Sequence, residues 1–288
     1  MRSTPTKSLT REEWLHLRKT GIGGSDAGAV CGVNPYKSPA SVYADKISPD
    51  IQLEDNESMR QGRDFEDYVA RRFTESTGLK VRRSNVMYQH DDYPWMLADI
   101  DRMVVGERSG LECKTASAFS YDRWKSIDSI PEHYIIQCAH YMSIMGWDHM
   151  YLACLILGRD FIYYRIDRDD ELIKNLITIE RNFWEGHVLK GILPDPDGSS
   201  DFDKLIGGNY FKTNKNSSIP LIGWDDQLRR RSDLNRLISK LETEKKEIDQ
   251  QIKLFMAENE IAENEKYRIT WKYSESTGQR RFIVKEAA

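Results

Sequence analysis

The chain has 288 residues, enough for one large domain or for a domain with an appendage, and its formal net charge at pH 7 is -4. This balance excludes a uniformly basic surface, so any contact with a polyanion must use local patches of charge. The four cysteines are scattered without a Cys-x-x-Cys pair, which predicts free thiols rather than a zinc site or a disulfide framework. Because no apolar run reaches about 18 residues and no signal core opens the chain, we expect a protein of the cytoplasm without a membrane span.

Three short helices are predicted at the start of the chain. Thr10 followed by Glu13 forms a capping pattern and opens the first helix. The glycine-rich stretch "GIGGSDAG" follows, in which Ser25 or Asp26 can cap a second helix. Ser38 with the proline after it opens the third.

A longer amphipathic helix comes next and leads into three strands. Its apolar residues recur at the 3–4 spacing of a buried face, and Gly78 ends it (Phe65, Tyr68, Val69, Phe73). The segments "KVRRSNVMYQH", "WMLADIDRMVVG" and "SGLECKTA" then each read as one strand. The tight turn "GERSG" between the last two predicts a hairpin.

The second half of the chain continues with a helix, two strands and a helix. "PEHYIIQCAHYMSIMGW" is helical, "HMYLACLILG" is a strongly apolar central strand, "DFIYYRID" pairs with it, and "DDELIKNLITIERNFWEGHVLKG" is a long amphipathic helix. This order predicts an α/β (α+β mixed) core with one mixed sheet flanked by helices. We place this core in residues 1–195.

The remaining residues predict an appendage to the core. Residues 196–225 are rich in glycine, serine, proline and asparagine, which indicates a loop or linker. Residues 226–288 form a C-terminal extension, in which a long helix over 226–258 has apolar residues near heptad spacing and precedes a closing β-hairpin (Leu234, Leu237, Leu241, Ile248, Ile252, Phe255).

Glu112 and Lys114 are the first candidates for chemistry. They lie two apart in an apolar strand and therefore project from the same face. The preceding strand carries Asp99 and Asp101, and the hairpin turn can bring one of them opposite Glu112. Paired carboxylates suit Mg²⁺, and a lysine beside the ion can serve a water or offset phosphate charge. These residues alone leave a structural salt bridge as the alternative.

The wider pattern resembles the PD-(D/E)xK nuclease superfamily, and within it the lambda exonuclease / YqaJ-like viral recombinase family. The resemblance rests on four blocks in order over roughly residues 11–190: "LRKTGIGGSDAGAVCGVNPYKSPASVYADK", "GRDFEDYVARRF", "MLADIDRMVVG…GLECKTAS" and "IPEHYIIQCAHYM". It implies a restriction-endonuclease-like core with a central mixed sheet, followed here by a long helix and hairpin.

The resemblance also implies roles for single residues. Metal binding is implied for two carboxylates and one backbone carbonyl (Asp101, Glu112, Cys113 carbonyl). Lys114 matches the lysine that serves the attacking water. Three more side chains match positions that lie around the site (Glu66, Gln137, Tyr141). Two residues match those that hold the terminal 5′-phosphate of DNA (Arg18, Ser25). One departure is Arg102, where the family usually has glycine after the first aspartate, and Asp99 remains a competitor for the role of Asp101.

The implied activity is a Mg²⁺-dependent exonuclease, with Mn²⁺ as a substitute, that digests duplex DNA ends 5′→3′ and leaves 3′ single-stranded tails for phage-type recombination. Implied partners are duplex DNA ends, a phage single-strand annealing protein and further copies of the chain in a ring-like trimer. The implied setting is the cytoplasm of a bacterium that hosts a phage or prophage. Two alternatives stay open: an endonuclease of the same fold, and a non-catalytic scaffold that binds DNA ends.

Overall fold

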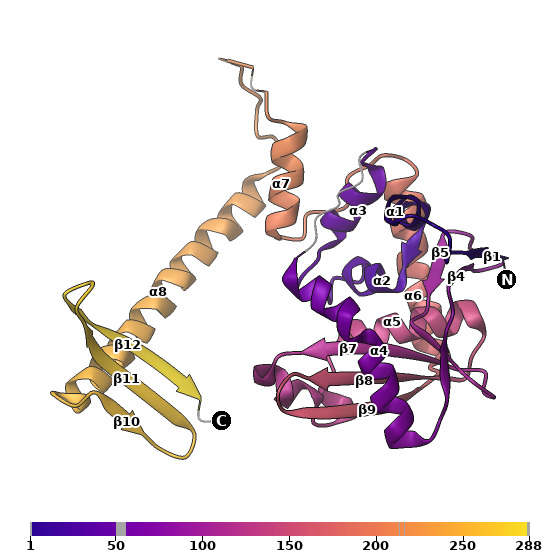
Figure 1. Ribbon diagram of the computed structural model, residues 1–288. Coiled ribbons are helices and arrows are strands. Elements are labelled where there is room, and N and C mark those ends of the chain that lie inside the picture. The colour runs from indigo at the N-terminus through magenta and orange to yellow at the C-terminus, as the bar shows by residue number, and fades with distance from the viewer. Residues whose placement is uncertain (1, 50–55, 213, 216, 287–288) are drawn as a thin grey trace. The chain divides into compact units, whose positions relative to one another are not determined.

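The computed structural model describes residues 2–49, 56–212, 214–215 and 217–286. The chain divides into two compact units, Met1–Thr213 and Asn214–Ala288 (Figure 1). The first unit carries every residue singled out above for chemistry. Across the described residues, no helix combines the length and the apolar character that a bilayer crossing requires.

The first four helices of the N-terminal unit lie where they were predicted (α1 Arg11–Lys19, α2 Gly24–Val30, α3 Pro39–Ile47, α4 Glu57–Thr77). The capping box of Thr10 and Glu13 is formed, and Ser38 caps α3. The expected cap of α2 was wrong, because Gly23 occupies the N-cap position. Asp26 lies in the first turn, where its carboxylate accepts a hydrogen bond from the Gly23 N–H at 3.3 Å.

A five-stranded mixed sheet forms the centre of the unit, in the order β3-β6-β7-β8-β9 (β3 Val81–Arg83, β6 Arg102–Val104, β7 Gly110–Ala116, β8 His149–Ile156, β9 Asp160–Asp167). The predicted hairpin is confirmed as the antiparallel β6–β7 pair. Strands β7 and β8 are parallel. Their connection passes through the short turns η1 (Ala118–Trp124) and η2 (Ile127–Ser129) and helix α5 (Glu132–Met145).

A second sheet, in the order β1-β4-β5-β2, was not predicted (β1 Arg2–Pro5, β2 Ile22–Gly23, β4 Val86–Gln89, β5 Met96–Asp99). It arises because two segments that were each predicted as one strand form two strands, one in each sheet. The segment "KVRRSNVMYQH" forms β3 and β4, and "WMLADIDRMVVG" forms β5 and β6. The first divides around Asn85, whose φ of 51° places it in the left-handed region and turns the chain. The second divides after Asp99, so Asp101 lies in the short link between β5 and β6.

The central sheet is covered on both faces. Helix α4 packs on one face, where Phe73 contacts a cluster that includes Leu111 and Ala153. The neighbouring strand residues Leu152 and Cys154 point the other way, into the larger core beneath α2, α5 and α6 (Asp170–Phe183) (Figure 1). The residues of β7 therefore lie between two packed layers, which fixes the direction of their side chains.

Helix α5 is fixed by a fully buried histidine. His140 Nε2 lies 3.0 Å from the carbonyl oxygen of Leu97 on β5, and its Nδ1 lies 2.7 Å from a carboxylate oxygen of Glu180 on α6. A carbonyl only accepts, so Nε2 carries a proton and donates it. The single ring joins α5 to β5 and α6, and it thereby sets the position of the α5 face toward β7.

The predicted loop over 196–225 contains a helix, α7 (Ser200–Asn209), which follows the π-helical turn η3 (Trp184–Val188) and a short irregular stretch. Ser199 caps α7. Residues 213 and 216 of the same segment lie outside the described residues.

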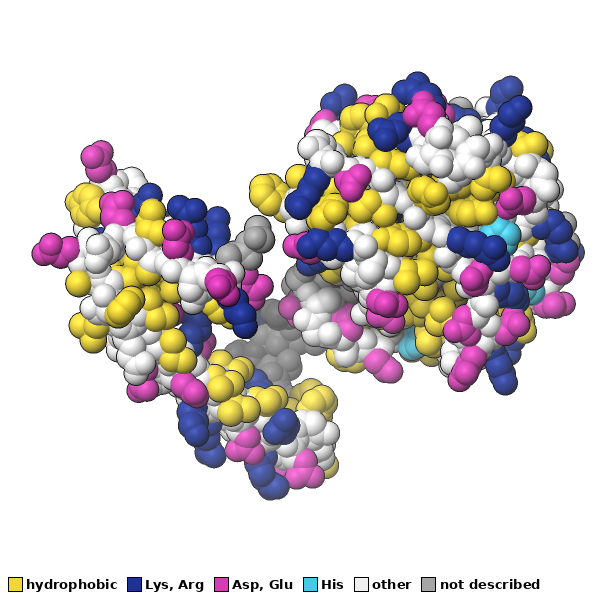
Figure 2. Space-filling model, turned by 90° about the horizontal axis from the view of Figure 1, so that it is seen from below, with side chains coloured by type: hydrophobic (Ala, Val, Ile, Leu, Met, Phe, Trp, Pro, Cys, Tyr) yellow, Lys and Arg dark blue, Asp and Glu magenta, His cyan; other side chains and the backbone are white. Residues whose placement is uncertain are grey.

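The C-terminal unit consists of one long helix, α8 (Asp225–Met256), and a three-stranded sheet (β10 Ile261–Glu263, β11 Tyr267–Ser274, β12 Gln279–Glu286). The predicted hairpin is the β11–β12 pair, and β10 was missed. Among the described residues of α8 only Met256 is buried. Acidic and basic side chains are intermixed on the visible face of each unit (Figure 2), which agrees with the small net charge.

Candidate active site

A pocket of about 200 Å³ collects most of the residues predicted for chemistry. It lies where α1, α2, α5, the link after β5 and strand β7 meet. Its lining includes seven of the predicted residues, and also Asp99 and Trp14 (Arg18, Ser25, Asp101, Glu112, Lys114, Gln137, Tyr141). Glu66 and Cys113 do not line it, although both lie beside residues that do.

The centre of the pocket is an acidic cluster, which we define as Asp101, Glu112 and Lys114. The Asp101 carboxylate accepts a hydrogen bond of 2.8 Å from the backbone N–H of Cys113. One oxygen of Glu112 accepts from the Gln137 amide at 2.6 Å and from the Lys114 ammonium at 2.7 Å. The other Glu112 oxygen is buried and has no hydrogen-bond partner within the described residues.

The two carboxylates repel one another. Loss of water contact raises the pKa of Asp101 well above its usual range, and the nearby negative charge of Glu112 raises it further. Burial likewise raises the pKa of Glu112, while Lys114 lowers it. The cluster therefore has one ammonium group for two carboxylates, and ionisation of both carboxylates leaves negative charge in excess.

Lys114 is firmly protonated in this arrangement. Burial lowers its pKa, but the carboxylates of Glu112 and Asp101 outweigh burial and raise the pKa above the ordinary value. Its ammonium also donates to the Gln137 side-chain oxygen at 3.0 Å and lies 4.9 Å from the ring centroid of Tyr134. Gln137 thus contacts both Glu112 and Lys114 and holds their relative position.

Arg102 is buried and connects the link after β5 to helix α4. Its guanidinium pairs with Glu66 and, at 2.6 Å, with Asp67, both on α4. It also donates to the backbone carbonyl of Asp101 at 2.6 Å. The charge of Glu66 is thereby offset by an arginine, and Glu66 does not line the pocket.

The acidic cluster fits a hard divalent cation. Among the described residues, no group of three or more histidine, cysteine, aspartate or glutamate side chains is arranged to hold a metal ion. Mg²⁺ is commonly bound by only one or two protein carboxylates, and waters and substrate phosphate complete its coordination. Asp101 and Glu112, with one buried Glu112 oxygen that has no hydrogen-bond partner within the described residues, match that requirement. A cation there would also relieve the repulsion that raises the pKa of Asp101.

Asp99 and Asp101 differ in what their carboxylates contact. The Asp99 side chain accepts from the indole N–H of Trp14 at 2.9 Å, and its backbone carbonyl accepts from the Tyr141 hydroxyl at 3.0 Å. The Asp101 carboxylate instead faces β7. Asp99 therefore joins α1, α5 and β5, whereas Asp101 forms the pair with Glu112.

A basic cluster adjoins the pocket through Arg18. We define it as Arg18, Lys37, Lys46 and the buried Asp26. The Asp26 carboxylate contacts both lysine ammonium groups at 2.8 Å and the Arg18 guanidinium at 3.7 Å. Although burial opposes ionisation, these cations together hold the pKa of Asp26 well below its usual range. Asp45 lies 3.6 Å from Lys46 and offsets part of the remaining positive charge.

Two of the three cations of the basic cluster are partly exposed. Arg18 and Lys37 are 28% and 30% exposed, whereas the Lys46 side chain is 1% exposed. The Arg18 guanidinium donates to the Ser25 hydroxyl at 2.8 Å. A guanidinium, a hydroxyl and excess positive charge form a receptor for a phosphate group.

Sequence reasoning missed the roles of Lys37, Lys46 and Trp14. Lys46 lies on α3, and its contact with Asp26 spans 20 positions without a local pattern. The available signal was Asp26 itself, an acidic residue inside a glycine-rich stretch predicted to turn tightly, since a buried carboxylate requires a cation partner.

The sequence of this chain matches a known domain family and a relative of that family. The model of the YqaJ-like viral recombinase domain matches residues 13–148, a range that contains every predicted site residue. The uncharacterized protein YqaJ of Bacillus subtilis (strain 168) is 37% identical over 268 residues, which cover 92% of this chain and 84% of that protein.

Among solved structures, the alkaline exonuclease LHK-Exo of Laribacter hongkongensis matches at 20% identity with a TM-score of 0.51, over 62% of this chain and 95% of the exonuclease. The structure of LHK-Exo in complex with dAMP matches equally. At this identity the match shows the fold alone, and that fold is the predicted nuclease core. With its relative and its domain model in agreement, this chain belongs to the family of the YqaJ-like viral recombinase domain.

Proposed function

We propose that the protein is a divalent-metal-dependent deoxyribonuclease that digests duplex DNA from its ends in the 5′→3′ direction and leaves 3′ single-stranded tails. One observation carries the proposal. The acidic cluster and the phosphate receptor of Arg18 and Ser25 line the same small pocket. A pocket that combines hydrolytic groups with an anchor for a second phosphate is suited to a strand that ends there.

The reaction is hydrolysis of one phosphodiester bond. The oxygen of a water forms a bond to phosphorus and the P–O3′ bond breaks. The water gives one proton to solvent, and the leaving O3′ takes one proton up. The released nucleotide carries a 3′-hydroxyl, and the shortened strand carries a new 5′-phosphate. That phosphate can then occupy the receptor at Arg18, so each turnover regenerates the end that the pocket binds.

The residues of the acidic cluster have separate tasks. Glu112 and Asp101, with the Cys113 carbonyl, are the proposed ligands of Mg²⁺ or, as a substitute, Mn²⁺. When bound, the cation supplies positive charge that stabilises the phosphate transition state and favours ionisation of the attacking water. Lys114, held protonated by its neighbours, orients that water and offsets charge on the phosphate oxygens.

Gln137 and Tyr141 position this machinery. Gln137 contacts Glu112 and Lys114 directly. Tyr141 accepts from the Gln137 amide at 3.3 Å while it donates to the Asp99 carbonyl. These hydrogen bonds fix the rotamers of the side chains that touch the reacting atoms, which is what precise placement of a water requires.

A comparison of three substrates tests the proposal. Linear duplex with 5′-phosphate ends, linear duplex with 5′-hydroxyl ends and covalently closed circles are each incubated with and without Mg²⁺. The proposal predicts metal-dependent digestion of linear DNA, slower digestion of the 5′-hydroxyl ends, and intact circles. Circles cut as fast as linear DNA would establish the endonuclease alternative, and end binding without digestion in Mg²⁺ or Mn²⁺ would establish the scaffold.

We also propose partners and a setting on the strength of the family. These are a phage-type single-strand annealing protein, further copies of this chain in a ring-like trimer, and a bacterial cytoplasm. The four cysteines are all free thiols, which is consistent with a reducing compartment. Helix α8 is the candidate contact, because it exposes apolar side chains at heptad spacing, among them Leu234, Leu241 and Ile248.

A further inference from the structure

A second, larger cavity adjoins the active-site pocket. Its volume is about 610 Å³, within the roughly 300–1,000 Å³ that is typical of ligand sites, and it extends across α1, α3 and α7. Arg18 lines both cavities, so they meet at the phosphate receptor. No role for this groove follows from the hydrolysis of a blunt end, in which the strand stops at Arg18.

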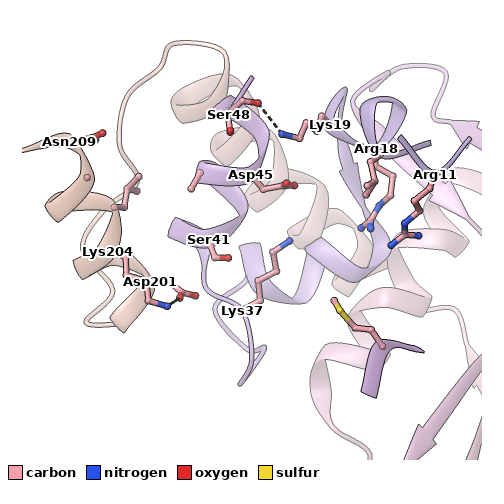
Figure 3. Close-up of a pocket in the computed structure, with 15 residues that line it drawn as sticks. Arg11, Arg18, Lys19, Lys37, Ser41, Asp45, Ser48, Asp201, Lys204 and Asn209 are labelled. Atoms are coloured by element: carbon pink, nitrogen blue, oxygen red, sulfur yellow. Dashed lines mark hydrogen bonds and ion pairs between the residues drawn. The ribbon is translucent and has the colours of Figure 1, made fainter. Parts of the chain in front are cut away.

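The groove carries cations along its length. In Figure 3, Arg18 projects from α1 at one end, Lys37 lies below α3, and Lys204 lies on α7 at the other end. Lys37 is held by the buried Asp26, which gives it a fixed position at 30% exposure. Asp201 is the acidic residue nearest the far end, and it is engaged by Lys204 at 3.4 Å and by the Ser38 hydroxyl at 3.3 Å.

The rest of the lining is mixed rather than uniformly charged. Apolar side chains contribute to it from four helices (Leu15, Ala44, Met59, Leu205), and Ser41 and Asn209 add hydrogen-bonding groups. A groove with cations at successive positions can follow the phosphates of a single strand, and the aliphatic side chains beside them offer surface to its exposed bases. A compact inorganic anion would use only the Arg18 end.

From this continuity we infer that the groove holds a single-stranded 5′ extension of the strand being cut. The inference rests on the proposed function and extends its substrate class to 5′-tailed duplex ends. The tail runs from Arg18 past Lys37 toward α7, and hydrolysis occurs at the same acidic cluster. Water adds to phosphorus and the P–O3′ bond breaks as before, but the fragment that leaves with the 3′-hydroxyl is an oligonucleotide rather than a single nucleotide.

The experiment uses the full-length protein with Mg²⁺ and four duplexes that carry 5′-phosphates. One has a blunt end, three have 5′ tails of one, two or four nucleotides, and the far end of each is blocked. A label on the 5′-terminal nucleotide reports the size of the first product. We expect tailed ends to be cut within about threefold of the blunt rate and to release labelled oligonucleotides.

Labelled mononucleotide from tailed ends would overturn the inference while leaving the proposed function intact, because the tail would then be trimmed from its tip. A protein that does not cut tailed ends at all would also overturn the inference. Failure to digest the blunt duplex would instead count against the proposed function. The same series therefore separates the two conclusions.

Two variants test the path itself. Lys204→Glu reverses charge at the far end, and Ser41→Tyr adds bulk to the wall. Each should slow cutting of the four-nucleotide tail at least tenfold and change blunt-end digestion by less than twofold. The matched control is Lys174→Glu on the exposed face of α6, which should change neither rate. Equal losses on blunt and tailed ends in both groove variants would show that the groove serves the duplex instead.

Discussion

The acidic cluster of the active-site pocket and the basic cluster that adjoins it through Arg18 are built in opposite ways. The basic cluster surrounds one buried carboxylate with three cations, and the acidic cluster gives two carboxylates a single ammonium. As a result, the pKa of Asp26 is lowered and the pKa of Asp101 is raised, although both residues have lost water contact. Burial raises the pKa of both carboxyls, and only the cations around Asp26 reverse that effect.

The difference also separates what each cluster does for the protein. The basic cluster is internally satisfied through Asp26, and it contributes to stability while it presents two cations. The acidic cluster is unsatisfied without a cation, as the unpartnered Glu112 oxygen shows. Changes in the first should therefore affect folding, whereas changes in the second should affect activity and can even increase stability.

The largest expected effect is loss of activity in the acidic cluster. Glu112→Gln keeps the shape of the side chain but removes a charge, and removal of one catalytic electrostatic group costs about 10²–10³ in rate. Because Glu112 contacts Lys114 and is a proposed metal ligand, we expect a loss of about 10³-fold or more, measured as nucleotide release from 5′-phosphorylated duplex.

The matched control lies elsewhere in the same sequence. Glu244 precedes Lys246 with the same Glu-x-Lys spacing, but it is exposed on α8. The Glu244→Gln variant should digest DNA at the rate of the unaltered protein. A Glu112→Gln variant with more than a tenth of the normal rate would contradict the assignment of the acidic cluster.

The next largest effect is on stability in the basic cluster. Lys46→Met leaves Asp26 without its buried partner, and removal of one member of a buried ion pair costs roughly 3–5 kcal/mol. Since Lys37 remains to compensate Asp26, we expect about 3 kcal/mol, or a fall in Tm of about 6–12 °C. Thermal unfolding followed by circular dichroism measures it.

Lys37→Met serves as the comparison, because that side chain contacts the same carboxylate but is partly exposed. Its cost should be less than half that of Lys46→Met. Equal costs for the two variants would mean that burial of the partner does not set the energy, and the contrast between the clusters would lose its basis.

A smaller effect concerns recognition of the strand end. Arg18→Ala removes a charged donor to the terminal phosphate, and such hydrogen bonds are each worth about 1.5–3 kcal/mol. We expect the preference for 5′-phosphate over 5′-hydroxyl ends to fall by about tenfold, with the rate on 5′-hydroxyl ends little changed. An undiminished preference would move the phosphate receptor away from Arg18.

The smallest effect distinguishes the clusters by pH. A carboxyl whose folded pKa is raised contributes stability at low pH that is lost as pH rises through that pKa. Asp101→Asn removes this loss, so in the absence of metal it should raise the free energy of unfolding at pH 8 by roughly 1 kcal/mol, or about 2–4 °C in Tm. The gain should shrink toward pH 4.

Mg²⁺ provides the matching control for that variant. Added at pH 8, it should raise the Tm of the unaltered protein and leave the Tm of Asp101→Asn unchanged. Asp26 predicts the opposite pH trend, because its lowered pKa contributes stability that is lost as pH falls below about 4. A pH-independent gain for Asp101→Asn would refute the cause given for its raised pKa.

The sequence predicts the acidic cluster better than the basic one for a physical reason. Glu112 and Lys114 share a face because strand geometry alternates, and Asp101 follows through one tight turn. The contacts of Asp26 with Lys37 and Lys46 depend on how α2 and α3 pack, which no local period encodes. The division of two predicted strands at Asn85 and after Asp99 had only a weak local signal, since an asparagine or an aspartate is uncommon in strands without ending them by itself.

The arginine after Asp101 has a consequence for how this chain can change. Arg102 satisfies Glu66, Asp67 and the Asp101 carbonyl at once, so a glycine cannot replace it alone. Replacement of Arg102 by glycine would remove this cation from Glu66 and Asp67, and the Glu66 carboxylate lies near those of Asp101 and Glu112. We therefore expect positions 66, 67 and 102 to vary together among relatives, and a chimera that exchanges β6 without α4 should fold poorly.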